Sequence, residues 1–404
     1  MSFELRTVSG GVTAAKGFLA CGMPCGIKRT GRPDLALIWA ERPARAAAVF
    51  TRNRFRAHPV RLDMARLRQG VAQAVLINSG NANCLTGRRG YRRTLLLSKR
   101  AAKILKVPEY RLFLFSTGVI GIPLPADKIE MALPELVEGL SREGAGPAAQ
   151  AILTTDRVRK EIAVRFKAGG RTVTLGGMAK GSGMIQPNMA TMLAFLTTDA
   201  VIGLSALRKA LAESCRRSFN HISVDGQMST NDSVLLLANG LALNRAVRPA
   251  GRDFEVFQRA LDFVTARLAE MIVSDGEGVT RLMKVCVRRA ASPDEAERVA
   301  LSVVNSPLVK TMLSGGDPNW GRVLQAVGAT RVPFAPDKVK VSFDSHPVFA
   351  KGERTRYSRS KLKGVFKRRI VPILIELGRG KYSCEKLGAD LSPLYVRVNA
   401  RYGT

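Results

Sequence analysis

Short apolar segments, bounded by glycine, asparagine or proline, recur through the first half of the chain. Residues 36–39 (Ala-Leu-Ile-Trp), 74–77 (Ala-Val-Leu-Ile) and 112–115 (Leu-Phe-Leu-Phe) are continuously apolar. Runs of this length between turn-forming residues are typical of buried strands. Residues 164–175 alternate between apolar and polar positions around Gly169-Gly170, which predicts a β-hairpin.

Segments with the apolar periodicity of helices lie between these strands, but strands and helices do not alternate regularly. We expect helices over residues 93–105, 205–218, 254–272 and 293–306. Ser292 is suited to cap the last of these, with two acidic residues in the first turn. Further strands are expected over residues 192–196, 233–238, 284–290 and 338–343. The pattern predicts a mixed α/β or α+β fold.

The chain is strongly basic, with 64 Lys and Arg against 32 Asp and Glu among 404 residues, for a net charge of +32. A charge of this size makes nucleic acid a candidate partner. However, the basic residues are scattered in pairs, apart from one dense stretch at residues 351–369, and no helix-turn-helix, zinc-finger or aromatic RNA-binding signature accompanies them. We therefore expect charged, solvated faces, while the nucleic-acid reading stays open as an alternative.

Other function classes are disfavoured by composition. A hydrophobic fraction of 46% is enough for a globular core. No apolar run is long enough to cross a membrane, and the first residues lack the pattern of a secretion signal, so we expect a cytoplasmic protein. The six cysteines are too few for a disulfide scaffold. Cys21 and Cys25 lack a second ligand pair at zinc-site spacing, so we expect free thiols and no metal.

The densest candidate for chemistry is residues 176–193, Gly-Gly-Met-Ala-Lys-Gly-Ser-Gly-Met-Ile-Gln-Pro-Asn-Met-Ala-Thr-Met-Leu. Between Thr172 and Ala200 only Lys180 and Asp199 are charged, so we expect this stretch to be interior. Its glycines permit close approach of backbone to a ligand, but the spacing of a phosphate-binding loop is not met. Taken alone, the stretch is equally compatible with a tight loop that feeds a buried strand, with Lys180 reaching toward solvent.

With its neighbours, however, this stretch resembles the signature of the glutamate N-acetyltransferase family, also called ornithine acetyltransferase, of arginine biosynthesis. Further segments fit the family in order and extend the resemblance from about Gly10 to the last residue. They are Phe50-Thr-Arg-Asn-Arg54, Asn78-Ser-Gly-Asn-Ala-Asn83, Ser116-Thr-Gly-Val-Ile-Gly121, Thr154-Thr-Asp156, Ser229-Thr-Asn-Asp232, Asp275-Gly-Glu-Gly278, Gly316-Asp-Pro-Asn-Trp-Gly-Arg322 and Asn399-Ala400.

The resemblance implies self-cleavage between Ala190 and Thr191, which would give an alpha chain of residues 1–190 and a beta chain of residues 191–404. These would be co-folded halves of one body and not independent domains, assembled as a heterotetramer of two alpha and two beta chains. The implied fold is the N-terminal-nucleophile type shared with self-processing aminopeptidases, with mixed sheets and flanking helices.

The implied activity is transfer of acetyl from N-acetylornithine to glutamate through an acetyl ester on Thr191. An N-terminal threonine supplies both a nucleophile and, in its α-amine, a base. Accordingly none of the three histidines, His58, His221 and His346, lies in a triad-like motif. No cofactor is implied; some relatives also use acetyl-CoA as a substrate, and the sequence does not decide whether this chain does.

The site residues carry over one by one. Thr117 and Gly118 are implied as oxyanion donors. The implied substrate contacts are Thr154, Lys180, Thr191, Glu277, Asn399 and Thr404. Of these, Lys180 suits a carboxylate of the substrate and Glu277 suits an amino group. By itself, the segment Asp275-Gly-Glu-Gly278 would favour an ordinary acidic turn over a binding site.

Several positions depart from the family pattern. Gln227 stands where a carboxylate is usual, and Arg401 replaces an aspartate near the C-terminus. Arg52 and residues 351–369 are more basic than is usual in the family. These changes affect the expected local charge balance and the packing of the C-terminal tail, and leave the nucleophile unchanged. Two other readings remain open: a basic nucleic-acid-binding protein on an inherited enzyme scaffold, and an amidase or aminopeptidase of the same fold group that uses water as the acceptor.

Overall fold

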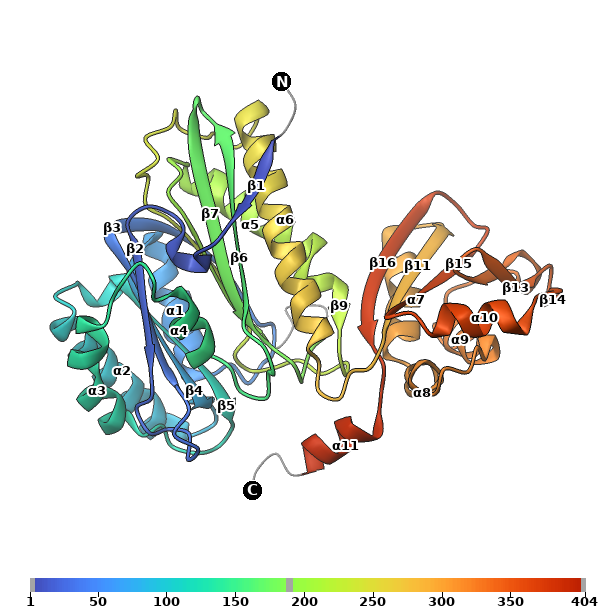
Figure 1. The fold of residues 1–404 in the computed structure, drawn as a ribbon, viewed down its shortest axis with the longest axis horizontal. Helices are drawn as coiled ribbons and strands as arrows, with labels where there is room; N and C mark the ends of the chain where they lie inside the picture. Colours follow the sequence, from blue (N-terminus) through green and yellow to red (C-terminus); the bar gives the residue numbers. More distant parts are fainter. Residues whose placement is uncertain (1–3, 187–191, 401–404) are drawn as a thin grey trace. The chain divides into compact units, whose positions relative to one another are not determined.

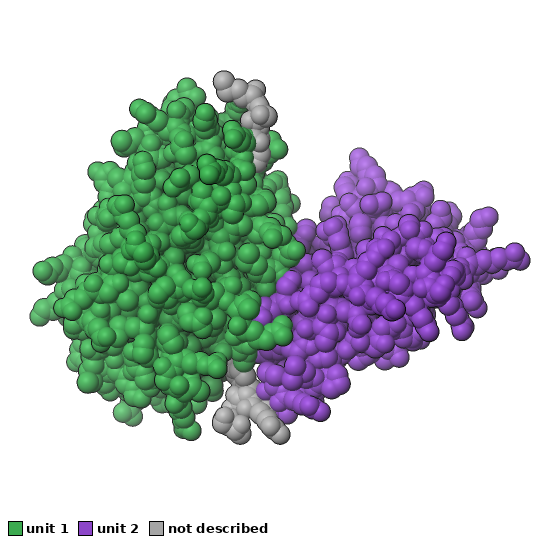
Figure 2. Space-filling view, in the orientation of Figure 1, with its two compact units in different colours: residues 1–181, 188–220, 228–272 green, residues 182–187, 221–227, 273–404 purple. Residues whose placement is uncertain are grey.

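The computed structural model describes residues 4–186 and 192–400. These residues divide into two compact units, coloured green and purple in Figure 2. The first unit comprises residues 1–181, 188–220 and 228–272, and the second comprises residues 182–187, 221–227 and 273–404. Each unit therefore takes chain from both sides of residue 190.

Nine strands among the described residues of the first unit form one mixed sheet. Its order is β1 (Leu5–Val8), β6 (Lys160–Ala168), β7 (Arg171–Lys180), β8 (Leu193–Thr198), β10 (Ser233–Ala238), β3 (Leu35–Phe50), β4 (Val71–Asn81) and β5 (Leu112–Val119), and β2 (Phe18–Met23) pairs with β3. β8 and β10 are parallel, as are β4 and β5, whereas β3–β4 and β6–β7 are antiparallel. The predicted mixed α/β class is confirmed.

Both faces of this sheet are covered, which explains the continuously apolar runs in the sequence. Leu112 and Leu114 face a core shared with α2 (Gly87–Ile104) and α3 (Ala126–Glu138), whereas Phe113 and Phe115 face a core that includes α4 (Ala145–Ala151). A strand covered on both faces has no solvated positions to alternate with. In Figure 1, α2 and α3 lie together beside β4 and β5.

The remaining helices around this sheet are α1 (His58–Arg66), α5 (Leu204–Arg217) and α6 (Arg252–Ser274). α5 packs on β3, and Phe257 of α6 makes an edge-on ring contact with Phe166 of β6. Short 3-10 turns lie at Gly11–Thr13, Leu67–Gln69, Glu109–Arg111, Phe219–His221 and Pro336–Lys338.

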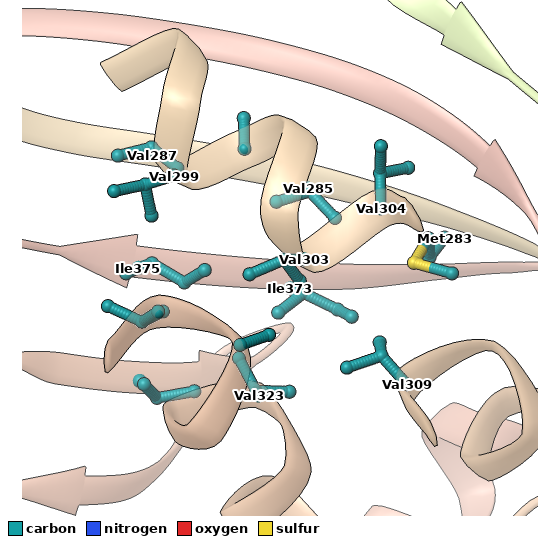
Figure 3. Close-up of a cluster of buried hydrophobic side chains, with 14 of the residues drawn as sticks. Met283, Val285, Val287, Val299, Val303, Val304, Val309, Val323, Ile373 and Ile375 are labelled. Atoms are coloured by element: carbon teal, nitrogen blue, oxygen red, sulfur yellow. The ribbon is translucent and has the colours of Figure 1, made fainter. Parts of the chain in front are cut away.

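The second unit has a sheet of its own, formed by seven strands within its described residues. Its order is β14 (Glu353–Arg354), β13 (His346–Ala350), β12 (Lys340–Phe343), β15 (Ile370–Glu376), β11 (Leu282–Ala290), β16 (Tyr382–Ala389) and β9 (Ile222–Ser223). Its helices are α7 (Pro293–Asn305), α8 (Pro307–Gly315), α9 (Trp320–Gly328), α10 (Arg359–Phe366) and α11 (Pro393–Ala400). Figure 3 shows its core, where Val285 of β11, Val303 of α7 and Ile373 of β15 meet.

Most sequence-based element predictions are confirmed. The hairpin turns at Gly169-Gly170, and the Ser292 hydroxyl caps α7 by accepting from the Glu295 N–H at 3.2 Å. The strand expected from residue 338 begins at Lys340, because residues 336–338 form a 3-10 turn. β7 from Val173 onward and all of β8 are buried, as expected for the stretch poor in charge. Cys21 and Cys25 are free thiols, as predicted.

Candidate active site

The predicted oxyanion residues lie where β5 ends against β4. Thr117 is buried, and Gly118 has φ +137°, a conformation that side-chain-bearing residues rarely adopt. A Cβ on Gly118 would also clash with the backbone of Gly80 and Asn81. Only glycine fits here, and the β4–β5 register becomes irregular at the same place. The Thr117 side chain and the backbone of Gly118, which carries no side chain, thereby lie side by side at the end of a buried strand.

Lys180, the last residue of β7, connects this turn to two other predicted site residues. Its ammonium Nζ donates to Thr154 Oγ1 at 2.8 Å and to Thr117 Oγ1 at 3.4 Å. The residue is only 4% exposed, so the alternative in which Lys180 reaches toward solvent is wrong. The fold therefore brings Thr117, Thr154 and Lys180 together from three separate segments.

Asp156 is the counter-ion of this cluster, a role that sequence analysis missed. Its Oδ1 accepts from Lys160 Nζ and from the Gly181 N–H, both at 2.7 Å, and its Oδ2 lies 3.8 Å from Lys180 Nζ. Burial alone would raise the pKa of the Asp156 carboxyl, but Lys180 and Lys160 hold that pKa well below its usual value. The carboxylate is therefore ionised and stabilises two buried ammonium groups.

A second lysine lies beside the cluster and was also missed. Lys28 Nζ donates to the carbonyl oxygens of Pro33 and Leu153, each at 2.7 Å, and so fixes the residue that precedes Thr154. Burial lowers the pKa of Lys28 to about 8; Asp34 opposes this shift and Lys180 adds to it. Because basic residues are scattered throughout this sequence, nothing in it singles out Lys28.

The predicted cleavage residues Ala190 and Thr191 lie outside the described residues, but the chain that follows them is well defined. The Met192 N–H donates to Asp232 Oδ1 at 3.0 Å, and the Met192 carbonyl accepts from the Ser233 N–H at 3.0 Å. Leu193, the first residue of β8, pairs with Lys180 on one side and with Ser233 on the other. The strand that begins two residues after Thr191 therefore starts beside the lysine cluster.

Glu277 and Asn399 lie in the second unit and contact each other. Asn399 Nδ2 donates to Glu277 Oε2 at 2.7 Å, and the Glu277 N–H donates to the Ser182 carbonyl at 2.9 Å. A Cβ on Gly183 would come within 2.5 Å of Glu277 Oε2, so the carboxylate lies directly against glycine backbone. Glu277 is 7% exposed and is not a solvated acidic turn. Thr404 lies outside the described residues.

Gln227 stands where the family usually has a carboxylate, but the carboxylate of Asp225 lies nearby. Asp225 accepts hydrogen bonds from the backbone N–H groups of Met184, Ile185 and Gln227 and from the Tyr395 hydroxyl. Burial raises the pKa of Asp225, and burial together with Asp225 raises that of Tyr395. Asp225 thus ties α11 to the segment that leads toward the predicted cleavage point. Arg401, the other departure from the family, lies outside the described residues.

Neither a metal centre nor a membrane span is found within residues 4–186 and 192–400. Among the described residues, no group of three or more His, Cys, Asp or Glu side chains is arranged to hold a metal ion. No helix within residues 4–186 and 192–400 is long and apolar enough to cross a membrane.

Comparison with known proteins identifies the family. The model of the ArgJ family matches residues 19–404. The arginine biosynthesis bifunctional protein ArgJ of Caldanaerobacter subterraneus is 43% identical over 404 residues, 99% of this chain and 100% of that protein. The crystal structure of arginine biosynthesis bifunctional protein argJ from Bacillus halodurans is 41% identical, covers 47% of this chain and 100% of that chain, and has a TM-score of 0.45.

A structure of ornithine acetyltransferase complexed with ornithine from Mycobacterium tuberculosis is 38% identical, covers 46% of this chain and 98% of that chain, and has a TM-score of 0.42. The family assignment depends on the sequence matches, which extend over almost the whole chain. With the family model matching residues 19–404 and a relative 43% identical along its full length, the chain belongs to the ArgJ family.

Proposed function

We propose that this protein is a self-cleaving acetyltransferase that moves the acetyl group of N-acetylornithine to glutamate, with Thr191 as nucleophile. The observation that carries the proposal is the convergence of Lys180 on Thr154 and Thr117 beside the start of β8. Each of these residues occupies a position of the family motif. A buried ammonium that faces two hydroxyls suits an anionic substrate next to the nucleophile.

Cleavage comes first in the proposed sequence. The Thr191 hydroxyl attacks the Ala190 carbonyl carbon, the peptide C–N bond breaks, and the hydroxyl proton ends on the nitrogen. Water then hydrolyses the ester, which leaves a carboxylate on Ala190 and restores the Thr191 hydroxyl beside the α-amine that the C–N cleavage released. An α-amine has an ordinary pKa of about 7.7–8.0, so it serves as a base for its own hydroxyl at neutral pH.

Acetyl transfer then proceeds in two half-reactions. The Thr191 hydroxyl attacks the acetyl carbon of N-acetylornithine, ornithine leaves, and an acetyl ester remains. The amine of glutamate attacks this ester and leaves as N-acetylglutamate. In both steps the Thr117 hydroxyl and the Gly118 N–H are proposed to stabilise the oxyanion.

Substrate recognition is proposed to depend on charged side chains that pair with the charged groups of the two amino acids. Lys180, with Thr154, is proposed to bind the carboxylate that both amino acids carry, and Glu277 to bind an amino group. Asn399 holds Glu277 in place through its hydrogen bond of 2.7 Å and is proposed to contact substrate, as is Thr404. No metal or cofactor is needed, because the attacking group, the base and the oxyanion donors all belong to the chain.

The name of the relatives, bifunctional protein, supports a second reaction with acetyl-CoA as donor. We propose that the same acetyl ester on Thr191 is reached from either donor. The two fragments are proposed to stay together as a heterotetramer of two alpha and two beta chains in the cytoplasm.

The proposal is tested by incubating the purified protein with N-acetylornithine and isotopically labelled glutamate. Equal amounts of ornithine and labelled N-acetylglutamate are expected from the wild type, and none from Thr191→Ala. Release of free acetate that is independent of glutamate would replace this proposal with the amidase reading. Sequence-selective nucleic-acid binding that persists at physiological salt would favour the alternative hypothesis of a nucleic-acid-binding protein. Non-specific binding that depends only on charge weakens steeply with salt.

A further inference from the structure

Lys28, to which the proposed reaction assigns no role, holds one end of the peptide unit that joins Leu153 to Thr154. Lys28 Nζ donates to the Leu153 carbonyl at 2.7 Å, and the Thr154 N–H, at the other end of the same peptide unit, donates to Asp156 Oδ2 at 3.1 Å. The described residues 152–159 belong to no helix or strand, so hydrogen bonds to other segments fix the backbone there. Thr154 is therefore held from both ends of its peptide unit.

These hydrogen bonds connect Lys28 to the lysine that is proposed to bind substrate. Asp156 Oδ2 lies 3.8 Å from Lys180 Nζ, and Lys180 Nζ donates to Thr154 Oγ1 at 2.8 Å. The contacts thus run from Lys28 through the peptide unit and Asp156 to Lys180, and return to the Thr154 side chain. A displacement of the Leu153 carbonyl would therefore change the position of the Thr154 hydroxyl relative to Lys180 Nζ.

The position of Lys28 is fixed by its own loop. Its N–H donates to Asp34 Oδ2, and its Nζ also donates to the Pro33 carbonyl, both at 2.7 Å. Asp34 is fully buried, and its Oδ1 accepts from the Cys25 N–H at 2.6 Å. A buried carboxylate therefore sets the loop from which the Lys28 ammonium reaches Leu153.

The aliphatic stem of Lys28 lies against the backbone behind Gly118. A Cβ on Gly80 would lie 3.1 Å from Lys28 Cγ, and a Cβ on Gly118 would lie 2.3 Å from the Gly80 carbonyl carbon. The stem of Lys28 therefore packs on Gly80, which in turn packs on Gly118. One side chain supports both the residues assigned to the substrate carboxylate and the end of β5.

On the basis of the proposed function, we propose that Lys28 is a positioning residue for acetyl transfer. Its ammonium fixes the Leu153 carbonyl and so holds Thr154 and Lys180 in the arrangement that receives the carboxylate of the substrate. This role depends on the charge of the ammonium, because hydrogen bonds from an ionised donor are about twice as strong as those from a neutral one.

Lys28 loses this charge at a lower pH than an ordinary lysine does. Burial lowers the pKa of Lys28 to about 8, and Lys180 and Arg32 contribute to the decrease, while Asp34 and Asp156 oppose it. Below this pH the ammonium holds its carbonyl partners through charge-assisted hydrogen bonds. Above it the neutral amine holds them more weakly, so transfer should decline. In Lys28→Arg the decline should disappear, because a guanidinium keeps its proton throughout this range.

The test measures kcat/KM for N-acetylornithine between pH 6.5 and 9.5 in wild type, Lys28→Arg, Lys28→Met and Lys128→Met. The ratio of wild type to Lys28→Arg cancels every titration that the two proteins share, including that of the Thr191 α-amine. Lys128 is the matched control because its exposed ammonium donates to the Gly26 carbonyl of the same loop at 2.6 Å. Circular dichroism at each pH establishes that the proteins are folded.

We expect the ratio of wild type to Lys28→Arg to be constant below pH 7 and to fall about tenfold by pH 9.5, as the charge-assisted bonds are lost. At pH 7, Lys28→Met should have a kcat/KM about ten- to a hundred-fold below that of wild type, mainly through a higher KM, because small misplacement of substrate-binding groups is costly. Lys128→Met should match wild type.

A ratio that changes less than about twofold over this pH range would overturn the proposal, as would equal losses in Lys28→Met and Lys128→Met. If Lys28→Arg does not fold, the advantage of wild type over Lys28→Met should shrink above pH 8, and an advantage that stays constant would overturn the proposal. If Lys28→Met does not fold, the ratio to Lys28→Arg decides. A wild type that transfers no acetyl group at any pH would instead reject the proposed function itself.

Discussion

The side-chain amide of Asn231 donates to the carbonyl oxygen of Ser116 at 2.8 Å and to that of Ala82 at 2.7 Å. Ser116 immediately precedes Thr117 and Gly118, the proposed oxyanion donors, and Asn231 lies two residues before β10, the parallel neighbour of β8. A single buried side chain thereby sets the position of Thr117 and Gly118 relative to the strand that follows Thr191. Under the proposed function, this bridge holds the residues assigned to the oxyanion in line with the strand that follows the nucleophile.

Asn231→Ala is therefore expected to lower kcat about ten- to a hundred-fold with little change in KM. Each buried carbonyl left without its donor costs about 1–3 kcal/mol, and small misplacement of catalytic groups is itself expensive. Steady-state kinetics of acetyl transfer measure both constants. Asn244→Ala is the control, because Asn244 is likewise buried and bridges the Val201 and Arg245 carbonyls in the same unit. Equal loss of kcat in the two variants would reduce Asn231 to a general packing role.

Thr117 is expected to matter through its hydroxyl. Thr117→Val keeps the shape of the side chain, removes one oxyanion donor, and should slow transfer about a hundred-fold or more. Thr117→Ser keeps the hydroxyl and should retain most of the activity. Single-turnover acetylation of the enzyme measures the step directly, and similar rates in both variants would remove Thr117 from the oxyanion site. Slower self-cleavage in Thr117→Val would indicate that the same donors serve both reactions.

Glu277→Ala should separate self-cleavage from transfer. The carboxylate is assigned to an amino group of the substrate and not to the peptide that is cut, so the variant should yield two fragments. Transfer should fall about ten- to a hundred-fold, the effect of losing a charge-assisted hydrogen bond worth about 1.5–3 kcal/mol. Glu385→Ala removes an exposed carboxylate of the same unit, paired with Lys284, and should be neutral. A cleaved Glu277→Ala protein with wild-type kcat/KM for both substrates would refute the assignment.

Asp156 should govern stability in acid. The pKa of Asp156 is lowered in the folded chain, so the native state binds fewer protons than the unfolded state. The resulting stabilisation is complete above the ordinary aspartate pKa of about 3.9. It is lost as the pH falls below that value toward the lowered pKa of the folded chain. Asp156→Asn should cost about 3–5 kcal/mol at neutral pH, because it removes one partner of a fully buried ion pair.

Urea unfolding of wild type and Asp156→Asn between pH 3 and 7 tests this, and the difference between them should shrink toward the acid end. Asp253→Asn is the control, because Asp253 pairs with an Arg245 side chain that is 79% exposed, and such pairs contribute about 1 kcal/mol at most. A difference between wild type and Asp156→Asn that does not change with pH would contradict the ion-pair account.

The continuously apolar segments of the sequence are strands with both faces buried. Residues 112–115 read as a strand because β5 is covered on both sides. β3 was recognised only at residues 36–39, although it continues to Phe50. Its exposed middle, Glu41-Arg42-Pro43, interrupts the apolar pattern, and its register with β4 shifts between Trp39 and Ala44. Burial makes a strand visible in sequence, whereas an irregular, solvated stretch hides one.

The candidate site likewise contains residues that the sequence identified and residues that it did not. Thr117, Thr154 and Lys180 could be named from motif resemblance, and the fold brings them together. Asp156 and Asn231 belonged to recognised motifs but received no role, because Asp156 acts on Lys180 and Asn231 acts on Ser116 across a long sequence separation. Contacts of this kind are created by strand order, which local spacing does not encode.

The most direct test of the central claim, an acetyl-carrying Thr191 at a new N-terminus, is intact mass spectrometry after brief incubation with N-acetylornithine. The account predicts two fragments, residues 1–190 and 191–404, with one additional acetyl group on the second that disappears when glutamate is added. Thr191→Ala should remain one chain without acetyl. A wild-type protein that catalyses transfer as a single uncut chain, or that carries the acetyl group on the first fragment, would contradict the account.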